Sequence, residues 1–383
     1  MRIGIDVRPM AEERRSGVEE YIRNLLENVF TLDKKNIYIL FYNSYKKDLP
    51  ASLLQFEKYP NVFVRRFRCP NKFLNFSLWY FRYPHLDKLL DVEIFYSPNL
   101  IFTALSSKCR KFITMHDLSF ERHPEFFNFY RRLWHKMIDP RRLVDQADQV
   151  ISVSESSKND MIDLYHCSPQ KIKCIYPGIS HQIFACKKTS EKFIEIAKKY
   201  KLPAKYILFL ATLEPRKNME GVITAYNYLR DNNKIRHKLV IAGGEGWMFQ
   251  ETKQLISASK YQEDIIQTGE VEDWERKYIY SGADLFVYAS FYEGFGFPPL
   301  EALACGTTVV CSYVASLPEV VGNSAILINP YDYSELAWAI ERGIKDKKLK
   351  EVLRISGLKQ AKKFSWERCA KEFVGLVEEE IDS

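Results

Sequence analysis

Two glutamates flank a glycine-rich stretch in the last third of the chain. Glu293 and Glu301 are separated by seven residues, which begin with Gly-Phe-Gly and include two prolines. Because Pro298 and Pro299 favour the first turn of a helix, we expect Glu301 in that turn and Glu293 in the loop before it. Amides at a helix start attract anions, and the two carboxylates can accept hydrogen bonds from hydroxyls. The pattern therefore predicts a binding site for a phosphate and for the hydroxyls of a sugar or ribose. The alternative is that the glycine-rich loop only caps a helix and that both glutamates are solvated.

A basic pair follows the apolar run at residues 206–211. Arg216 and Lys217 stand before a predicted helix, where Arg offers a planar fork of donors and Lys a compact charge. Such a pair can neutralise a diphosphate leaving group, whereas most isolated basic pairs are solvated on surface turns. The chain contains no Asp-x-Asp motif, the paired carboxylates that commonly hold a divalent cation against phosphates. We therefore expect no metal and assign the neutralising charge to the protein's own cations.

Three further candidates follow predicted strands or precede predicted helices. His116 and Asp117 end the apolar run that starts at residue 112, where a histidine is either catalytic or structural. Gly17 precedes a helical pattern, so its amide could approach a phosphate, and a simple turn explains it equally well. Gly243 opens a Gly-Gly-Glu-Gly stretch and is a weaker candidate for a phosphate or base loop. These residues extend the candidate site to both halves of the chain.

Short β-rich apolar runs alternate with helical patterns throughout, which is typical of parallel sheets covered by helices on both faces. In the first half we expect strands at residues 2–6, 37–42, 62–67, 93–97, 112–116, 150–154 and 173–176. In the second half we expect them at 206–211, 238–242, 265–269, 285–289, 307–311 and 325–328. Ligands bind beyond the carboxyl ends of such strands, where the candidate residues fall.

The length of 383 residues favours two domains, because a single core seldom grows to that size. We predict a Rossmann-like domain at 1–180, a linker at 181–203 and a second Rossmann-like domain at 204–364. A C-terminal helix at 365–383 is expected to pack back on the first domain. Two doubly wound α/β domains of this kind would face each other across a cleft.

The composition indicates a folded cytoplasmic protein. Hydrophobic residues make up 46% of the chain, and no apolar run is long enough to cross a bilayer. The first residues favour a strand over a signal peptide. Eight cysteines without a C-x-x-C pair favour reduced thiols over a disulfide or zinc framework.

The net charge of +7 is concentrated in residues 61–142, which carry fifteen Lys and Arg against seven Asp and Glu. Within this window, the stretches at 65–83 and 126–136 mix cations with aromatic rings. Such segments can lie on the surface of an anionic bilayer. The alternative is that their aromatic rings fill the core of the first domain. We expect anionic lipid or an anionic acceptor as the partner and do not expect nucleic acid.

The glutamate motif, the Arg-Lys pair and the His-Asp pair together resemble the signature of the retaining glycosyltransferases of family 4, which have the GT-B fold. The resemblance spans nearly the whole chain and is strongest from residue 208 to 322. It implies that Glu301 holds ribose hydroxyls and that Arg216 and Lys217 bind the diphosphate. It assigns the donor sugar to Glu293 with the amides of Gly294, Phe295, Gly296 and Phe297.

The same resemblance extends to the residues outside the motif. It implies that His116 reaches the donor sugar, with Asp117 orienting the ring, and that the backbone at Val271 meets the base. Gly17 matches a phosphate loop that is usually richer in glycine in the family. No cofactor is implied, because the nucleotide sugar is a co-substrate.

The implied reaction is transfer of a hexose with retention from a nucleotide diphosphate sugar to a glycan or a lipid-linked glycan. Residues 116–125 resemble bacterial mannosyltransferases of polysaccharide assembly, so GDP-mannose is the first choice of donor and a UDP-sugar is the alternative. A lipid-linked acceptor would place the enzyme peripherally at the inner face of the membrane.

Three other classes are less consistent with the sequence. A dehydrogenase needs G-x-G-x-x-G after a first strand, which neither half contains. A sugar phosphorylase would need lysine-bound pyridoxal phosphate, which no feature indicates. A catalytically silent nucleotide-sugar-binding protein has no need of the complete His, Arg, Lys and Glu set.

Overall fold

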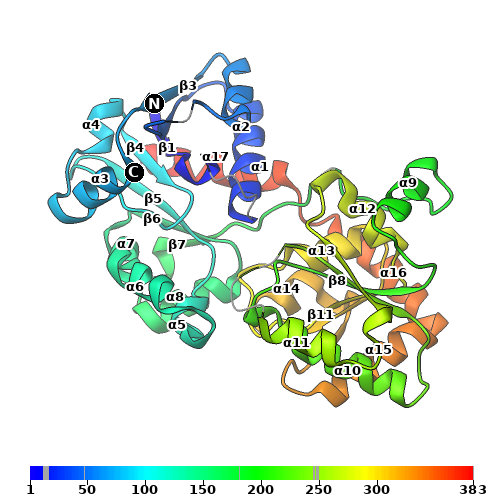
Figure 1. Cartoon of the computed structure of the whole chain (residues 1–383). Helices are drawn as coiled ribbons and strands as arrows, with labels where there is room; N and C mark the ends of the chain where they lie inside the picture. Colours follow the sequence, from blue (N-terminus) through cyan, green and yellow to red (C-terminus); the bar gives the residue numbers. More distant parts are fainter. Residues whose placement is uncertain (12–16, 47, 181, 245, 247–249, 383) are drawn as a thin grey trace. The chain divides into compact units, whose positions relative to one another are not determined.

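The structure, a computed structural model, describes residues 1–11, 17–46, 48–180, 182–244, 246 and 250–382. The chain divides into two compact α/β units (Figure 1). Unit 1 consists of Met1–Gly178 and Ser365–Ser383, and unit 2 consists of Ile179–Phe364. Each unit is built on one parallel sheet, which confirms the predicted fold class.

The sheet of unit 1 has the strand order β3-β2-β1-β4-β5-β6-β7. Its strands are β1 (Arg2–Asp6), β2 (Ile37–Asn43), β3 (Val62–Phe67), β4 (Ile94–Ser97), β5 (Arg110–Met115), β6 (Gln149–Ser152) and β7 (Ile172–Cys174). Neighbouring strands pair in parallel throughout. The order reverses between β1 and β4, and ligands bind beyond the carboxyl ends of parallel strands at such a reversal.

Helices cover this sheet. They are α1 (Gly17–Leu32), α2 (Ala51–Leu54), α3 (Asn71–Phe76), α4 (Leu86–Leu90), α5 (Ser119–Arg122), α6 (Phe129–Ile138), α7 (Pro140–Gln146), α8 (Glu155–Tyr165) and α17 (Trp366–Asp382). Shorter helical turns are η1 (Arg8–Ala11), η2 (Gln55–Lys58), η3 (Ser77–Phe81), η4 (Pro124–Phe126) and η5 (Pro169–Lys171). α1 buries Tyr21, Leu25 and Val29 at a spacing of four residues, which gives it one apolar face.

The sheet of unit 2 has the order β10-β9-β8-β11-β12-β13, the same pattern as the first six strands of unit 1. Its strands are β8 (Tyr206–Leu210), β9 (Lys238–Ala242), β10 (Ile265–Gly269), β11 (Leu285–Tyr288), β12 (Val309–Ser312) and β13 (Ile326–Ile328). Its helices are α9 (Glu191–Lys199), α10 (Met219–Asp231), α11 (Gln250–Ala258), α12 (Asp273–Gly282), α13 (Phe297–Ala304), α14 (Leu317–Val321), α15 (Tyr333–Lys345) and α16 (Lys347–Ala361), with the turns η6 (Pro215–Lys217), η7 (Gln262–Asp264) and η8 (Gly322–Ser324). Here the order reverses between β8 and β11.

The segment 181–203, expected as a linker, lies within unit 2 and contains α9. Ser190 caps this helix, and α9 packs against α12 through Lys199, whose Nζ lies 2.7 Å from Glu275 Oε1. At the other end of the chain, α17 packs against α1 and so belongs to unit 1, as Figure 1 shows.

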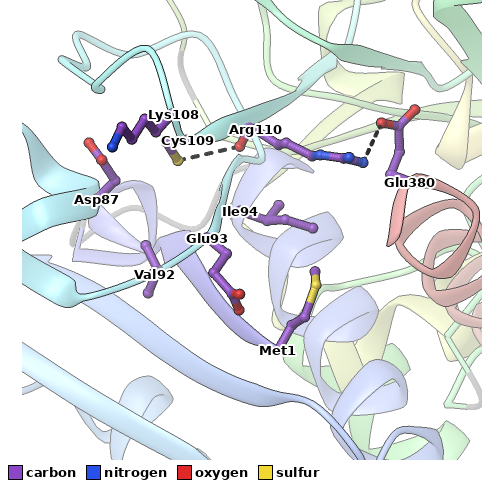
Figure 2. A pocket seen from close by; sticks show the side chains of 9 residues that line it. All are labelled: Met1, Asp87, Val92, Glu93, Ile94, Lys108, Cys109, Arg110 and Glu380. Carbon is purple, nitrogen blue, oxygen red and sulfur yellow. Dashed lines mark hydrogen bonds and ion pairs between the residues drawn. The ribbon is translucent and has the colours of Figure 1, made fainter. Parts of the chain in front are cut away.

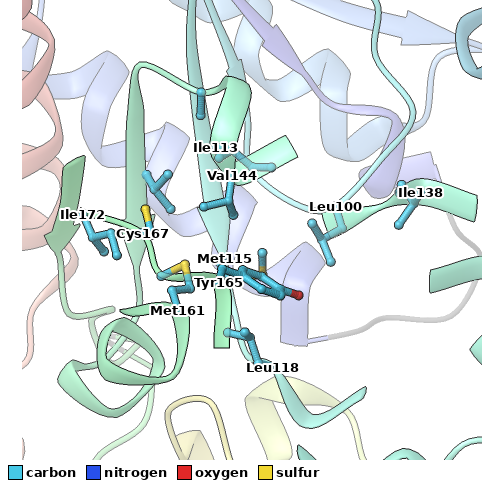
Figure 3. Close-up of a cluster of buried hydrophobic side chains, with 12 residues drawn as sticks. Leu100, Ile113, Met115, Leu118, Ile138, Val144, Met161, Tyr165, Cys167 and Ile172 are labelled. Atoms are coloured by element: carbon cyan, nitrogen blue, oxygen red, sulfur yellow. The ribbon is translucent and has the colours of Figure 1, made fainter. Parts of the chain in front are cut away.

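One buried cluster of unit 1 lies under the strands that lead to its candidate residues (Figure 3). It includes Ile113 and Met115 from β5, Val144 from α7, and Met161 and Tyr165 from α8. This packing holds β5 in place at its carboxyl end. Within the described part of the chain, no helix combines the length and apolar character needed to span a bilayer.

Candidate active site

Arg216 and Lys217 are held at the carboxyl end of β8. This strand is buried along its whole length, as a central strand of a parallel sheet requires. The chain then forms η6, and Asn218, left-handed with a φ of 55°, accepts a hydrogen bond of 3.1 Å from the amide of Gly221 at the start of α10. The basic pair is therefore fixed between a buried strand and a capped helix.

The loop between β11 and α13 holds Glu293. Gly296 ends this loop with a φ of 111°, and a Cβ there would lie 2.7 Å from a terminal carbon of Leu317. The hydroxyl of Ser316 lies 2.9 Å from the carbonyl oxygen of Glu293 and 2.7 Å from that of Phe295. These contacts fix the backbone around the carboxylate.

Charged side chains from the two loops meet in one buried cluster. Lys217 Nζ lies 2.6 Å from Glu293 Oε1, and Arg216 Nη1 lies 3.1 Å from Glu293 Oε2. Arg216 Nη2 also lies 2.8 Å from Glu214 Oε1, and Lys217 donates to the hydroxyl of Tyr288 at 2.9 Å. The charged side chains are between 5% and 15% exposed, so solvent screens these contacts weakly.

The electrostatics of the cluster keep the carboxylate charged. Burial alone would raise the pKa of Glu293, but Arg216 and Lys217 outweigh burial and lower the pKa to about 2. Burial and the nearby Glu293 both raise the pKa of Tyr288. Tyr288 is therefore a neutral hydroxyl that accepts a hydrogen bond from Lys217 and helps to position it.

This arrangement is suited to receiving an anion. The two cations and two carboxylates of the cluster balance each other. Among the described contacts, Lys217 uses two of its three N–H donors, on Tyr288 and Glu293, so one donor remains for an incoming oxygen. The cluster lies where the strand order of unit 2 reverses, between β8 and β11. Cations already held in place can stabilise charge that grows on a departing phosphate at little cost in reorganisation.

Glu301 lies deeper in α13 than the sequence predicts. The left-handed Gly296 precedes the helix, which begins at Phe297, so Glu301 is the fifth helical residue and lies beyond the first turn. The expectation of a first-turn position was therefore wrong. Glu301 is buried and accepts a hydrogen bond of 2.8 Å from the hydroxyl of Tyr280, and its Oε1 lies 3.4 Å from Arg276 Nη1.

The glycine stretch after β9 has a clear packing role. Gly243 has a φ of 130°, and a Cβ there would lie 1.9 Å from the carbonyl oxygen of Ala211. Its amide donates to the carbonyl oxygen of Gly269 at 2.9 Å, so a ligand role for Gly243 stays a prediction. Glu245 of the same stretch lies outside the described residues. Val271 is buried and precedes α12.

His116 and Asp117 lie in unit 1, directly after β5. The Nε2 atom of His116 lies 2.9 Å from the carbonyl oxygen of Pro98, and the ring packs edge-on against Tyr21 with centroids 4.8 Å apart. Burial lowers the pKa of His116, which favours the neutral ring at pH 7. Asp117 accepts hydrogen bonds from the amide and hydroxyl of Ser119 at 2.9 and 2.5 Å, which fixes the turn that leads into α5.

The structure brings Arg216, Lys217 and Glu293 together within unit 2, and it holds His116 beside Asp117 within unit 1. The meeting of the two sets across a cleft stays a prediction. Gly17 is the first residue of α1, and a Cβ there would meet nothing within 4 Å. Packing therefore does not require a glycine at this position.

Sequence reasoning missed four residues that support the site: Glu214, Tyr280, Tyr288 and Ser316. Tyr288 had a detectable signal, because it ends the apolar run that leads into the glutamate motif and a buried hydroxyl needs a partner. Glu214 and Ser316 gave no such signal, since their contacts depend on how separate loops fold together.

A cavity of about 410 Å³ in unit 1 lies away from these residues (Figure 2). It borders Met1, Ile94 and Arg110, which stand at or near the amino ends of β1, β4 and β5. Arg110 is already paired with Glu380 at 3.1 Å. Because ligands of parallel sheets bind at the opposite ends of the strands, this cavity is not assigned to the chemistry.

The sequence matches known proteins along most of its length. Residues 190–360 match the family model described as Glycosyl transferases group 1, and residues 15–183 match Glycosyltransferase Family 4. The O-antigen chain mannosyltransferase B of Escherichia coli is 33% identical over 282 residues, which are 73% of this chain and 71% of the relative.

Solved structures share the fold at lower identity. Sucrose-phosphate synthase from Thermosynechococcus elongatus superposes with a TM-score of 0.78 at 19% identity, over 100% of this chain and 99% of that one. Anabaena Alr3699/HepE in complex with UDP-glucose gives a TM-score of 0.74 at 17% identity, over 99% and 100%. With its family matches and its two parallel-sheet units, the chain belongs to the group 1 and family 4 glycosyltransferases, enzymes of the GT-B fold.

Proposed function

We propose that this glycosyltransferase moves a hexose, with retention and without a metal ion, from a nucleotide diphosphate sugar to a glycan or lipid-linked glycan. One observation carries the proposal above the others. Lys217, which is buried, and Arg216, which is partly buried, are preorganised on Glu293 at the point where the strand order of unit 2 reverses. A diphosphate bound there would be neutralised by these two protein cations, as a metal ion neutralises the diphosphate in other transferases.

In the proposed mechanism the acceptor hydroxyl attacks the reacting carbon on the face that the phosphate leaves. The departing phosphate takes the proton of that hydroxyl, while Arg216 and Lys217 stabilise its growing charge. Glu293 and the amides at the start of α13 hold the donor sugar. His116, neutral because burial lowers its pKa, donates from Nε2 to the carbonyl oxygen of Pro98, so its Nδ1 accepts a hydrogen bond from a sugar hydroxyl. Asp117 fixes the turn beside it.

For the donor, we propose GDP-mannose first. Support comes from the O-antigen chain mannosyltransferase B of Escherichia coli at 33% identity, a name that also refers to an O-antigen chain as the product. A UDP-sugar is the alternative, because the structural neighbour from Anabaena was solved with UDP-glucose. We expect Glu301 to hold the ribose and the backbone at Val271 to meet the base.

For the acceptor, we propose a growing polysaccharide, free or attached to lipid. A lipid-linked acceptor places the enzyme in the cytoplasm at the inner face of the membrane. The basic and aromatic stretches of unit 1 support this location, since they carry most of the excess positive charge.

The test is to incubate the purified chain with a soluble glycan acceptor and either GDP-mannose or a UDP-hexose, and to measure the released diphosphate in the presence of EDTA. We expect release from GDP-mannose at an undiminished rate, and thermal stabilisation by GDP larger than by UDP. A response to UDP alone would remove the mannose proposal. Loss of all turnover on chelation, restored by Mg²⁺, would remove the metal-free mechanism.

A further inference from the structure

Unit 1 exposes aromatic rings from two segments that are distant in sequence. In the first segment, which includes α3 and η3, Phe73, Phe81 and Tyr83 are 67%, 64% and 66% exposed. In the second, α6 exposes Phe129 and Tyr130 by 72% and 80%. The sequence left open whether such rings fill a core or face outward, and for these residues the structure places them outward. We call the exposed rings of residues 73–83 and 129–134 the aromatic face.

A cavity of about 610 Å³ links the two segments. Trp79 and Leu78 line it from η3, and Leu133 and Met137 line it from α6. Phe102 lines it as well and packs both against the buried cluster of Figure 3 and against a second buried cluster that includes Leu74, Leu78 and Leu86. Residues of both segments therefore meet at this hollow, which apolar and polar side chains line in similar measure.

The hollow is bordered by positive charge. Arg82, Lys136 and Arg142 line it and are exposed, and the partly buried Lys111 lines it too. Within the described ranges, no side-chain nitrogen of the first three lies within 4 Å of a carboxylate. Among the described residues that line the hollow, the one acidic residue is Asp139, whose carboxylate caps α7 by accepting from the backbone amide of Arg142.

α6 itself has the character of a helix that lies on a surface. Of its ten residues only Ile138 is buried, so the helix gains little from packing within unit 1. Its rings and its cations Arg131, Arg132 and Lys136 are on the outside. Such a helix is stabilised when its rings enter the headgroup layer of a bilayer and its cations meet lipid phosphates.

We propose that the aromatic face docks on an anionic phospholipid bilayer, with Arg82, Lys136 and Arg142 holding lipid phosphates at the mouth of the hollow. Charge favours this occupant over a second copy of the chain, because two copies would bring like cations together. The proposal rests on the proposed function in one respect: docking brings the enzyme to a lipid-linked acceptor.

The experiment measures binding of the purified full chain to phosphatidylcholine vesicles with and without phosphatidylglycerol, in the absence of any nucleotide sugar. We expect binding only with phosphatidylglycerol, and weakening as salt rises. Replacing Lys136 and Arg142 by Gln should weaken binding about 30-fold, because each cation near an anionic surface contributes about 1 kcal/mol. Phe129→Ser should weaken it about tenfold.

Matched controls come from exposed residues of unit 2. Replacing Lys347 and Lys348 by Gln makes the same charge change, and Trp338→Ser removes an exposed ring, 51% exposed against 72% for Phe129. We expect both controls to bind vesicles like the wild type. Because all of these side chains are exposed, the variants should melt like the wild type, which confirms that they are folded.

Each contrary outcome has a distinct meaning. Wild-type protein that stays in the supernatant with every vesicle overturns the proposal, as does equal weakening by the charge control. A dimer that Phe129→Ser dissociates, without vesicle binding, would instead identify a self-interface. Diphosphate release with a soluble acceptor tests the proposed function separately. If the protein releases no diphosphate but binds vesicles, the proposed function is wrong and the docking proposal is not affected. If it releases diphosphate but binds no vesicles, the docking proposal is wrong and the proposed function is not affected.

Discussion

Replacing Glu293 by Gln tests whether the buried cluster is built on charge. Glutamine keeps the shape of the side chain but removes the negative charge that Arg216 and Lys217 share. The pKa of Glu293 falls from an ordinary 4.5 to about 2, and each unit corresponds to about 1.4 kcal/mol. The carboxylate therefore contributes about 3 kcal/mol to stability near neutral pH. Because Glu293 is buried, solvent screens this contribution only weakly.

This magnitude predicts a measurable change in thermal unfolding. In a domain of 150–250 residues, 1 kcal/mol shifts Tm by roughly 2–4 °C, so E293Q should lower the Tm of unit 2 by about 6–12 °C. A nucleoside diphosphate should then stabilise the variant more than the wild type, because its phosphates supply the missing negative charge beside Lys217. The diphosphate carries no sugar, so loss of a sugar contact does not enter the comparison.

Glu275→Gln is the matched control. Glu275 is also buried in unit 2 and bonds to a cation, but that cation, Lys199, is half exposed, and the second partner is the hydroxyl of Tyr200. We expect this variant to lower the Tm as well, but to gain no more than the wild type from added diphosphate. An unchanged Tm in E293Q, or a ligand gain below that of the wild type, would refute the charge argument.

Three further predictions concern the same unit. Lys217→Ala should lower turnover on the order of 100-fold, and near-native turnover would contradict the assigned role of the cation. Gly243→Ala should lower the free energy of unfolding of unit 2 by several kcal/mol in urea, because the added Cβ would collide with the carbonyl oxygen of Ala211. Gly244→Ala is the control and should change this free energy little, because no atom lies within 4 Å of the Cβ that it adds. The pKa of Glu293 is lower in the folded state than in the unfolded state, so its stabilisation is complete above pH 4.5 and is lost as the pH falls toward 2. The Tm difference between wild type and E293Q should therefore vanish between pH 4.5 and 2. A difference that stays constant over this range would refute the lowered pKa.

The sheets could be predicted from sequence because their strands are short apolar runs between helical patterns. Each predicted strand lies within two residues of the observed one, from β1 at Arg2–Asp6 to β13 at Ile326–Ile328. Because parallel strands are buried on both faces, their sequences are almost continuously apolar, and few other elements produce a short run of this kind. The position of Glu301 was missed because the helix start depends on the left-handed Gly296, which proline placement alone does not specify.

Contacts between distant segments could not be predicted. Arg216 and Glu293 are 77 positions apart in the sequence. Arg216 was predicted to bind the diphosphate and Glu293 the sugar, and nothing in the sequence indicated that the two side chains pair with each other. The residues of α9 were expected in a linker because their pattern is short and polar, and their helix is anchored by the distant Glu275. Whether Phe129 faces solvent or a core likewise depends on which helices cover it.

Titration calorimetry of GDP in the presence of EDTA tests the central claim most directly. If protein cations hold the diphosphate, the wild type should bind GDP without any metal. Lys217→Ala should bind it about 10- to 100-fold more weakly, since a hydrogen bond to a charged group contributes about 1.5–3 kcal/mol. Wild-type binding that appears only after Mg²⁺ is added, or equal affinity in Lys217→Ala, would contradict the account.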